Sequence, residues 1–275
     1  MSTEHPSRPQ PIWLQNVKRQ IGKLLLPTAL KVYADLDWEN EAKAFQNSGS
    51  EYPTYYVKPH HGVAAGYLSN WQAFSWELIE NIFGIRRVRP SLLQMVQATN
   101  ACRIVDLGCG TALTSITLTQ HLPEAQLTLL DLSPYQLVAA HCQAHYAGLD
   151  GRTHMKQARA EETGLASESA DLVLATLLFH ELPCASACAV IQESQRILVP
   201  GGQLLIFDAI QQVVPWPRVD RAINELLAVV MHEVYWREYM SQPLWHVCKE
   251  KGFTHVERKL LFALPWIYQV VIATK

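Results

Sequence analysis

The stretch RIVDLGCGTALTSI, residues 103–116, decides the fold of this chain of 275 residues. Its first five residues form a short apolar run that contains one acid, Asp106. Two glycines, Gly108 and Gly110, come next, and a segment of helical length follows them. A buried strand that turns through glycines into a helix is typical of the ligand-binding unit of an α/β sheet. The turn is therefore predicted to hold a nucleotide-like ligand.

Downstream of this turn, short apolar runs alternate with segments of helical length. The runs are nearly continuous in hydrophobicity, which predicts strands buried on both faces. They are RIVDL (103–107), QLTLLDL (126–132), ADLVLATLL (170–178) and QLLIFDA (203–209), with predicted helices over about 112–121, 134–147 and 184–198. Such β-α-β alternation predicts a doubly wound, mostly parallel sheet that binds ligands at the carboxyl ends of its strands.

The tail of the chain has a different pattern. A long helix is expected over about 218–240 and a shorter one near 242–251. Two strands follow, over 254–262 and 265–274, and their short link requires antiparallel pairing. The sheet is therefore predicted to end in a hairpin.

The first hundred residues lack the β-α alternation. Residues 12–26 place apolar side chains on one helical face, which predicts a packing helix. Residues 52–76 are rich in Tyr, His, Trp and Gly. This composition favours a segment that covers a pocket or forms one of its walls. We therefore expect residues 1–99 to form a helical cover and substrate-pocket segment, and residues 100–275 to form the ligand-binding domain.

The composition excludes several classes of protein. Apolar residues make up 49% and charged residues 17% of the chain, and the formal net charge is −2, which argues against a nucleic-acid partner. The six cysteines form no CxxC pair, which favours reduced thiols without a metal site. No apolar run predicts a signal peptide or a spanning helix. We expect a cytoplasmic protein without stable membrane insertion.

The residues around the turn discriminate between nucleotide-like ligands. The dinucleotide fingerprint GxGxxG fails at Leu113, and the chain lacks the phosphate-loop pattern GxxxxGK[ST]. Asp131, 23 residues after Gly108 (131 minus 108), stands where an acid accepts hydrogen bonds from ribose hydroxyls. Asp106 suits a cationic amino group. A ligand with a ribose, a cationic end and no pyrophosphate, such as S-adenosylmethionine, fits this set of residues.

Residues 103–209 resemble the core of the class I S-adenosylmethionine-dependent methyltransferases. VDLGCGTA resembles the first motif of that family, with Ala112 where a third glycine is common. Asp131 resembles the acid that closes the second strand, and ARAEETG the segment that contacts adenine after the third. The resemblance implies a Rossmann-like sheet of seven strands with a C-terminal antiparallel hairpin. It also implies a set of cofactor-binding residues: Asp106, Gly108, Cys109, Gly110, Asp131, Leu132, Ala160, Glu161 and Leu177.

The acceptor end is predicted from histidines and one acid. His180 and Glu181 follow the fourth strand, where methyl group and acceptor are expected to meet, and a histidine there suits a general base. One of the adjacent His60 and His61 is expected to line the site, and His61 is assigned as the third candidate catalytic residue. The alternative for His180 is that it lines the cofactor pocket without acting as a base.

These observations predict methyl transfer by in-line displacement to a small, apolar or aromatic acceptor. Aromatic side chains from 52–76 and 218–240 are expected to close over that acceptor. A homodimer is compatible with the sequence. Two alternatives stay open, namely an inactive cofactor-binding regulatory or partner-binding protein of the same fold, and a nicotinamide oxidoreductase, which Leu113 disfavours. The two acids also have simpler interpretations, because Asp106 could cap the turn and Asp131 could cap the following helix.

Overall fold

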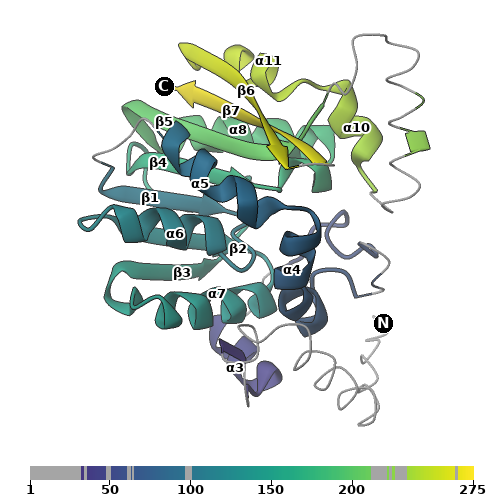
Figure 1. Ribbon diagram of the computed structural model, residues 1–275, viewed down its shortest axis with the longest axis vertical. Coiled ribbons are helices and arrows are strands. Elements are labelled where there is room, and N and C mark those ends of the chain that lie inside the picture. Colours follow the sequence, from purple (N-terminus) through teal and green to yellow (C-terminus); the bar gives the residue numbers. More distant parts are fainter. Residues whose placement is uncertain are drawn as a thin grey trace.

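Seven strands form one mixed sheet at the centre of the molecule. The computed structural model describes residues 32–33, 36–47, 51–60, 63, 65–96, 101–211, 222, 225–226, 234–263 and 266–275. The strands are β1 (Arg103–Leu107), β2 (Gln126–Asp131), β3 (Thr153–Gln157), β4 (Ala170–Thr176), β5 (Leu198–Ala209), β6 (His255–Ala263) and β7 (Trp266–Thr274). Their order is β3-β2-β1-β4-β5-β7-β6 (Figure 1).

The strand directions confirm the predicted Rossmann-like topology. Strands β1 to β5 pair in parallel with their neighbours. Strand β7 pairs antiparallel with both β5 and β6, so six strands run one way and β7 runs the other. The carboxyl ends of β1 to β4 therefore meet along one edge of the sheet, where the order reverses between β1 and β4.

Helices cover both faces of the sheet. They are α3 (Trp38–Phe45), α4 (Asn70–Ile82), α5 (Ile85–Met95), α6 (Leu113–His121), α7 (Pro134–Tyr146), α8 (Cys184–Ile197), α10 (Trp236–Ser241) and α11 (Leu244–Glu250), with short 3₁₀ turns η1 (Asp150–Arg152) and η2 (Phe179–Glu181). Two cores result: α5, α6 and α7 pack on one face, and α8, α10 and α11 on the other (Figure 1). Ile104 belongs to the first core and its neighbour Val105 to the second. The continuous apolar runs are thus strands buried on both faces, as predicted.

The described part of the N-terminal segment shares the main core. Ile85, Val88 and Leu92 of α5 are buried in the same cluster as Leu205 and Val270 of the sheet. Helices α3, α4 and α5 were not predicted individually from the sequence, and the helix expected over 12–26 lies outside the described residues. Within the described ranges no helix combines the length and hydrophobicity needed to cross a membrane.

Several predicted elements differ in extent from the structure, and β5 begins at Leu198 rather than at residue 203. Strand β4 ends at Thr176 rather than at residue 178, because Leu177 has a left-handed backbone with φ of 54°. The helix expected over 218–240 is not continuous, since residues 234 and 235 are non-helical and α10 begins at Trp236. Val234 and Tyr235, a β-branched and an aromatic residue, both have low helix propensity, which favours a break at this point.

Candidate active site

A cavity lies at the carboxyl ends of β1, β2 and β4, beside Tyr55, Tyr56, His60 and Tyr67. Its empty volume is about 1040 Å³, part of which is open to solvent. Its walls come from the glycine turn, from the segments that follow the strands and from α4. All nine predicted cofactor residues line it: Asp106, Gly108, Cys109, Gly110, Asp131, Leu132, Ala160, Glu161 and Leu177. The lining also includes Tyr55, Tyr56, His60, Tyr67, Trp76, Glu80 and Glu181.

The glycine turn adopts a backbone that demands glycine. Gly108 and Gly110 have φ of 62° and 53°, in the left-handed region where a side chain is strained. A Cβ on Gly108 would also approach Leu178 Cδ1 to 2.7 Å. At Gly110 the nearest atom to such a Cβ is Gln136 Oε1 at 3.8 Å, so this glycine serves conformation rather than close packing. The turn therefore leaves the edge of the cavity open beside Gly110.

Ala112 occupies a left-handed position as well. Its φ is 58°, and it is the N-cap residue of α6 without a capping side chain. A residue with a Cβ is strained in this conformation, so Ala112 costs more stability here than an alanine with φ below zero would.

Ala112→Gly is expected to stabilise the protein by about 0.5–1 kcal/mol, because relief of left-handed strain outweighs the added freedom of the unfolded chain. Urea unfolding measures this change. Ala187→Gly, in the regular helix α8, is the control and is expected to destabilise by a similar amount. A loss of stability in Ala112→Gly would contradict the strain at this position.

Asp131 braces the glycine turn from the end of β2. Its Oδ2 accepts a hydrogen bond from the Gly110 amide at 2.9 Å, and its Oδ1 accepts one from the Ser133 amide at 2.8 Å. The N-cap of α7 is Ser133, whose hydroxyl accepts from the Gln136 amide, so the capping role considered for Asp131 falls to its neighbour. Burial raises the pKa of Asp131 to about 6, against the lowering effect of these hydrogen bonds.

Asp106, in β1, is buried and incompletely hydrogen-bonded. Its Oδ1 has no hydrogen-bond partner within the protein, which disfavours a role confined to capping the turn. Burial raises the pKa of this carboxyl to about 7, with the nearby Asp131 as a smaller contribution in the same direction. A buried acceptor without a donor costs free energy unless a ligand supplies the donor.

Other buried oxygens without a partner belong to residues that line the same cavity. Gln136 Oε1, Glu161 Oε2 and the hydroxyls of Thr176 and Tyr56 are buried without a hydrogen-bond partner, and all four residues line the cavity. No Lys or Arg appears among its described lining residues. The site is therefore rich in acceptors and suits a ligand rich in donors. The ammonium group, ribose hydroxyls and adenine amino group of S-adenosylmethionine supply such donors, whereas the pyrophosphate of a dinucleotide would find no cation.

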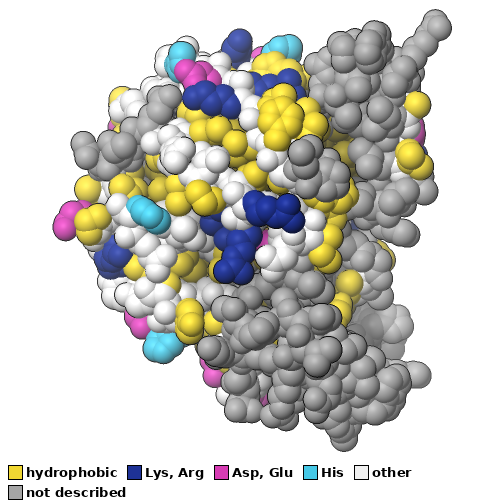
Figure 2. Space-filling model, viewed as in Figure 1, with side chains coloured by type: hydrophobic (Ala, Val, Ile, Leu, Met, Phe, Trp, Pro, Cys, Tyr) yellow, Lys and Arg dark blue, Asp and Glu magenta, His cyan; other side chains and the backbone are white. Residues whose placement is uncertain are grey.

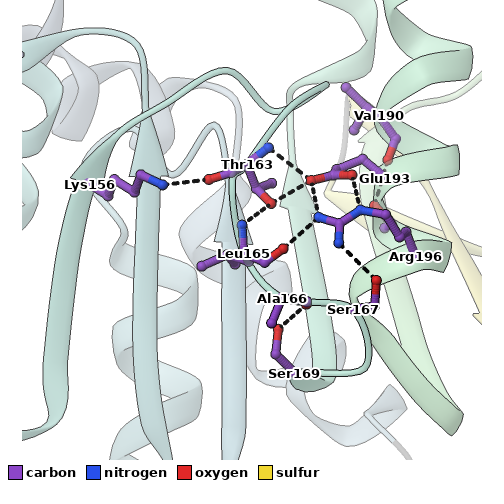
Figure 3. Close-up of polar contacts among 10 residues, drawn as sticks. Lys156, Thr163, Leu165, Ala166, Ser167, Ser169, Val190, Glu193 and Arg196 are labelled. Carbon is purple, nitrogen blue, oxygen red and sulfur yellow. Dashed lines mark hydrogen bonds and ion pairs between the residues drawn. The ribbon is translucent and has the colours of Figure 1, made fainter.

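The loop between β3 and β4 carries Ala160 and Glu161 and is fastened to α8. Glu193 Oε1 accepts from the Thr163 amide at 2.9 Å and from the Thr163 hydroxyl at 2.5 Å (Figure 3). Arg196 donates to both oxygens of Glu193 and to the Leu165 carbonyl. This network ties the loop to α8.

Glu193→Ala is expected to destabilise the protein by about 2–3 kcal/mol, because it removes the acceptor of Thr163 and the carboxylate partner of Arg196. It is also expected to weaken cofactor binding, since the loop that carries Glu161 loses its attachment. Urea unfolding and calorimetry measure the two effects. The exposed Glu250 offers a matched control, and Glu250→Ala is expected to change stability by less than about 0.5 kcal/mol. Equal effects of both variants would contradict this role of Glu193.

The acceptor end of the cavity contains a chain of ionisable side chains. Glu181 Oε2 lies 2.9 Å from His60 Nδ1, and its Oε1 accepts from the Tyr67 hydroxyl at 2.7 Å. His180 Nε2 is 3.5 Å from Glu181 Oε1, and His180 Nδ1 is 2.6 Å from Asp208 Oδ1. Residues distant in sequence thus form one chain, from Asp208 at the end of β5 to His60 in the segment over the cavity.

The structure separates the predicted catalytic residues. Glu181 lines the cavity. His180 does not line it, and its Nε2 lies 3.5 Å from Glu181 Oε1. His61 lies outside the described residues, and its neighbour His60 lines the cavity. The aromatic residues of 52–76 close over the site as expected. Those of the C-terminal segment do not, since Tyr235 and Tyr239 are absent from the lining.

Several residues of the site are not identified individually from the sequence. Tyr55, Tyr56, Tyr67 and Trp76 line the cavity, whereas the sequence indicates only an aromatic segment over 52–76. Asp208 ends a predicted strand, and its position at the carboxyl end of β5 was a usable signal. Among the described residues, no three His, Cys, Asp or Glu side chains gather in a way that would hold a metal ion.

Comparison with known proteins agrees with this geometry. The family described as "Methyltransferase domain" matches residues 104–202. The chain is 32% identical over 134 residues to a ubiquinone/menaquinone biosynthesis C-methyltransferase, UbiE, of Syntrophotalea carbinolica, covering 48% of this chain and 55% of that protein. It is 28% identical over 135 residues to ribosomal RNA small subunit methyltransferase C of an Enterobacter species, covering 48% and 36%.

A solved structure extends the likeness in fold. Phosphoethanolamine N-methyltransferase 2 of Haemonchus contortus, in complex with S-adenosyl-L-methionine, matches with a TM-score of 0.61 at 14% identity, over 84% of this chain and 61% of that one. The chain spans about half or less of the length of the two curated relatives. The relatives act on acceptors of different kinds, so they identify the cofactor-binding domain rather than the acceptor.

Proposed function

We propose that this chain, which contains a class I S-adenosylmethionine-dependent methyltransferase domain, transfers a methyl group to a small apolar or aromatic molecule. S-adenosylmethionine, when bound, supplies the activated methyl group. The observation that carries the proposal is the set of unpartnered acceptor oxygens around the cavity, Asp106 Oδ1, Gln136 Oε1, Glu161 Oε2 and Thr176 Oγ1, which match the donors of this cofactor.

The chain's own residues divide the work between two ends of the cavity. Asp106 would accept from the cofactor's ammonium group, and Asp131 from its ribose hydroxyls. Ala160 and Glu161 would hold the adenine. Glu181 and its neighbours stand at the other end, where the protein needs to align the acceptor and exclude water, steps that together lower a barrier by roughly 7 kcal/mol or more in favourable cases.

A small acceptor is favoured over a nucleic acid by the cover and the charge. Tyr55, Tyr56 and Tyr67 line the cavity together with Trp76, so aromatic rings cover part of it while another part stays open to solvent. On the face shown in Figure 2, Lys and Arg side chains are scattered among apolar and polar ones rather than gathered in a stripe. The formal net charge of −2 also favours a small acceptor over a nucleic acid.

The free thiols of the six cysteines fit a cytoplasmic setting, and a homodimer stays part of the proposal.

The test is a calorimetric titration of the full chain with S-adenosylhomocysteine, with NADH in parallel. Micromolar binding of the former alone is expected. NADH binding, or binding of neither, would overturn the proposal. Transfer of labelled methyl groups to a small-molecule extract, compared with ribosomal RNA, then distinguishes the acceptor classes, and label in RNA alone would refute the small acceptor.

A further inference from the structure

The charges at the acceptor end of the cavity are compensated within the protein. Glu80 lines the cavity and is paired with Arg89. Glu181 contacts His60 and Tyr67 through its two oxygens. A site for an ammonium acceptor would need a carboxylate whose charge is not already balanced, and a site for an anionic acceptor would need an unbalanced cation. The described side chains here favour an uncharged acceptor.

The geometry of His60 shows where a mobile proton lies. Its Nε2 is 3.2 Å from the Tyr55 carbonyl oxygen, which only accepts hydrogen bonds, so Nε2 carries a proton. Its Nδ1 faces a carboxylate oxygen of Glu181 at 2.9 Å, a contact that also requires a proton between the two atoms. His60 and Glu181 therefore share a proton at this contact. Both groups are buried, with side-chain exposures of 3% and 8%.

A second pair holds Glu181 from the other side. Asp208 is fully buried and accepts from the Phe179 and Ala209 amides as well as facing His180 Nδ1. His180 thereby keeps a fixed orientation, with its Nε2 directed to Glu181 Oε1. Carboxylate–histidine pairs of this kind fix a ring and support the group that the ring contacts. His180 and Asp208 are therefore positioning residues, and Glu181 is the group that faces the cavity.

We propose that the acceptor is an uncharged aromatic hydroxyl compound, a phenol, and that Glu181 takes its proton while His60 holds Glu181 in place. This inference rests on the proposed function. The rings of Tyr67 and Trp76 provide flat apolar walls for an aromatic acceptor. An amine acceptor would enter as a cation, for which this end of the cavity offers no uncompensated partner among the described residues.

The step balances in atoms and electrons. A lone pair of the phenolic oxygen forms the new bond to the methyl carbon, and the bond between that carbon and the sulfonium sulfur breaks with its electron pair left on sulfur. The phenolic proton passes to the Glu181 carboxylate and then to solvent. His60, whose Nδ1 lies 2.9 Å from Glu181 Oε2, holds that carboxyl group in place while the proton moves.

The experiment uses 4-nitrophenol as the probe, because its phenolate absorbs visible light and its neutral form does not. The full chain is saturated with S-adenosylhomocysteine and titrated with the probe at a pH where free 4-nitrophenol is mostly neutral. We expect the wild-type complex to bind the probe with a growing phenolate band. Phenethylammonium, a cation of similar size, is expected to bind at least tenfold more weakly.

Two variants assign the effect to residues. Glu181→Gln keeps the shape of the side chain but cannot take a proton, so it is expected to keep its affinity for S-adenosylhomocysteine within about twofold and to lose the phenolate band. His60→Gln is expected to reduce the band at least tenfold by displacing Glu181. Glu257, a partly exposed residue on β6 that does not line the cavity, supplies the matched control, and Glu257→Gln should behave as the wild type.

The outcomes separate this inference from the proposed function. If S-adenosylhomocysteine does not bind, both are overturned. If it binds and 4-nitrophenol does not, or if phenethylammonium binds more tightly, the methyltransferase survives and the phenol acceptor is wrong. An unchanged phenolate band in Glu181→Gln would overturn the role of Glu181.

Discussion

Asp131→Ala is expected to weaken the binding of S-adenosylhomocysteine by about 100-fold, equivalent to about 2.7 kcal/mol. Two effects add to this loss. The carboxylate would accept hydrogen bonds from the ribose, and bonds to a charged acceptor contribute roughly 1.5–3 kcal/mol each. The same carboxylate accepts from the Gly110 amide at 2.9 Å, so its removal also releases the glycine turn. Calorimetry at fixed pH measures the change.

Loss of fold is not expected to explain this result. The pKa of Asp131 is raised to about 6 by burial, so removal of the carboxyl relieves the cost of burying its charge, which offsets the loss of the acceptor of the Gly110 and Ser133 amides. Thermal unfolding of the ligand-free variant checks this. Asp131→Asn, which keeps the side-chain volume, is expected to lose less affinity than the alanine variant. Unchanged affinity in Asp131→Ala would refute the ribose contact.

Asp106→Asn is expected to stabilise the ligand-free protein at pH 8 by about 2 kcal/mol, or roughly 4–8 °C in Tm. Burial raises the pKa of Asp106 from 3.8 to about 7. An acid with a raised folded pKa costs stability wherever it is ionised, fully above pH 7. The cost falls as the pH drops through 7 and is absent below 3.8. The stabilisation by the asparagine should therefore shrink between pH 8 and pH 5.

The same variant is expected to bind S-adenosylhomocysteine at least tenfold more weakly, because the amide cannot offset the ligand's ammonium charge. Stability and binding should thus change in opposite directions, which is the usual relation at a functional site. Thermal unfolding from pH 5 to pH 8, with calorimetry at pH 8, tests both. A stabilisation that does not depend on pH would show that the charge of Asp106 is not its cause.

The sequence sufficed for the elements whose burial leaves a local pattern. Strand β1 matches its prediction at both ends, because RIVDL is continuous in hydrophobicity and the glycines stop it. Helix α7 starts at Pro134 as expected, after the capping Ser133. The cofactor end of the site follows from the same signals, since Gly108, Gly110 and Asp131 each sit directly at a strand end.

The acceptor end could not be predicted in the same way. His60 meets Glu181 across 121 positions of sequence, and Tyr55 meets Glu161 across 106, so neither contact leaves a periodic trace. The choice between His60 and His61 depends on the path of a segment without regular structure. The left-handed backbone of Ala112 and Leu177 arises from the turns they occupy, and neither residue type favours it.

The segment over the cavity is joined to both ends of the site at once. Tyr55 donates to Glu161 beside the adenine end, and Tyr67 and His60 contact Glu181 beside the acceptor end. Departure of the spent cofactor then requires that the same segment release both contacts, so we expect product release to be slow relative to methyl transfer. A burst of one methylated product per protein molecule, followed by slower turnover, is the kinetic consequence.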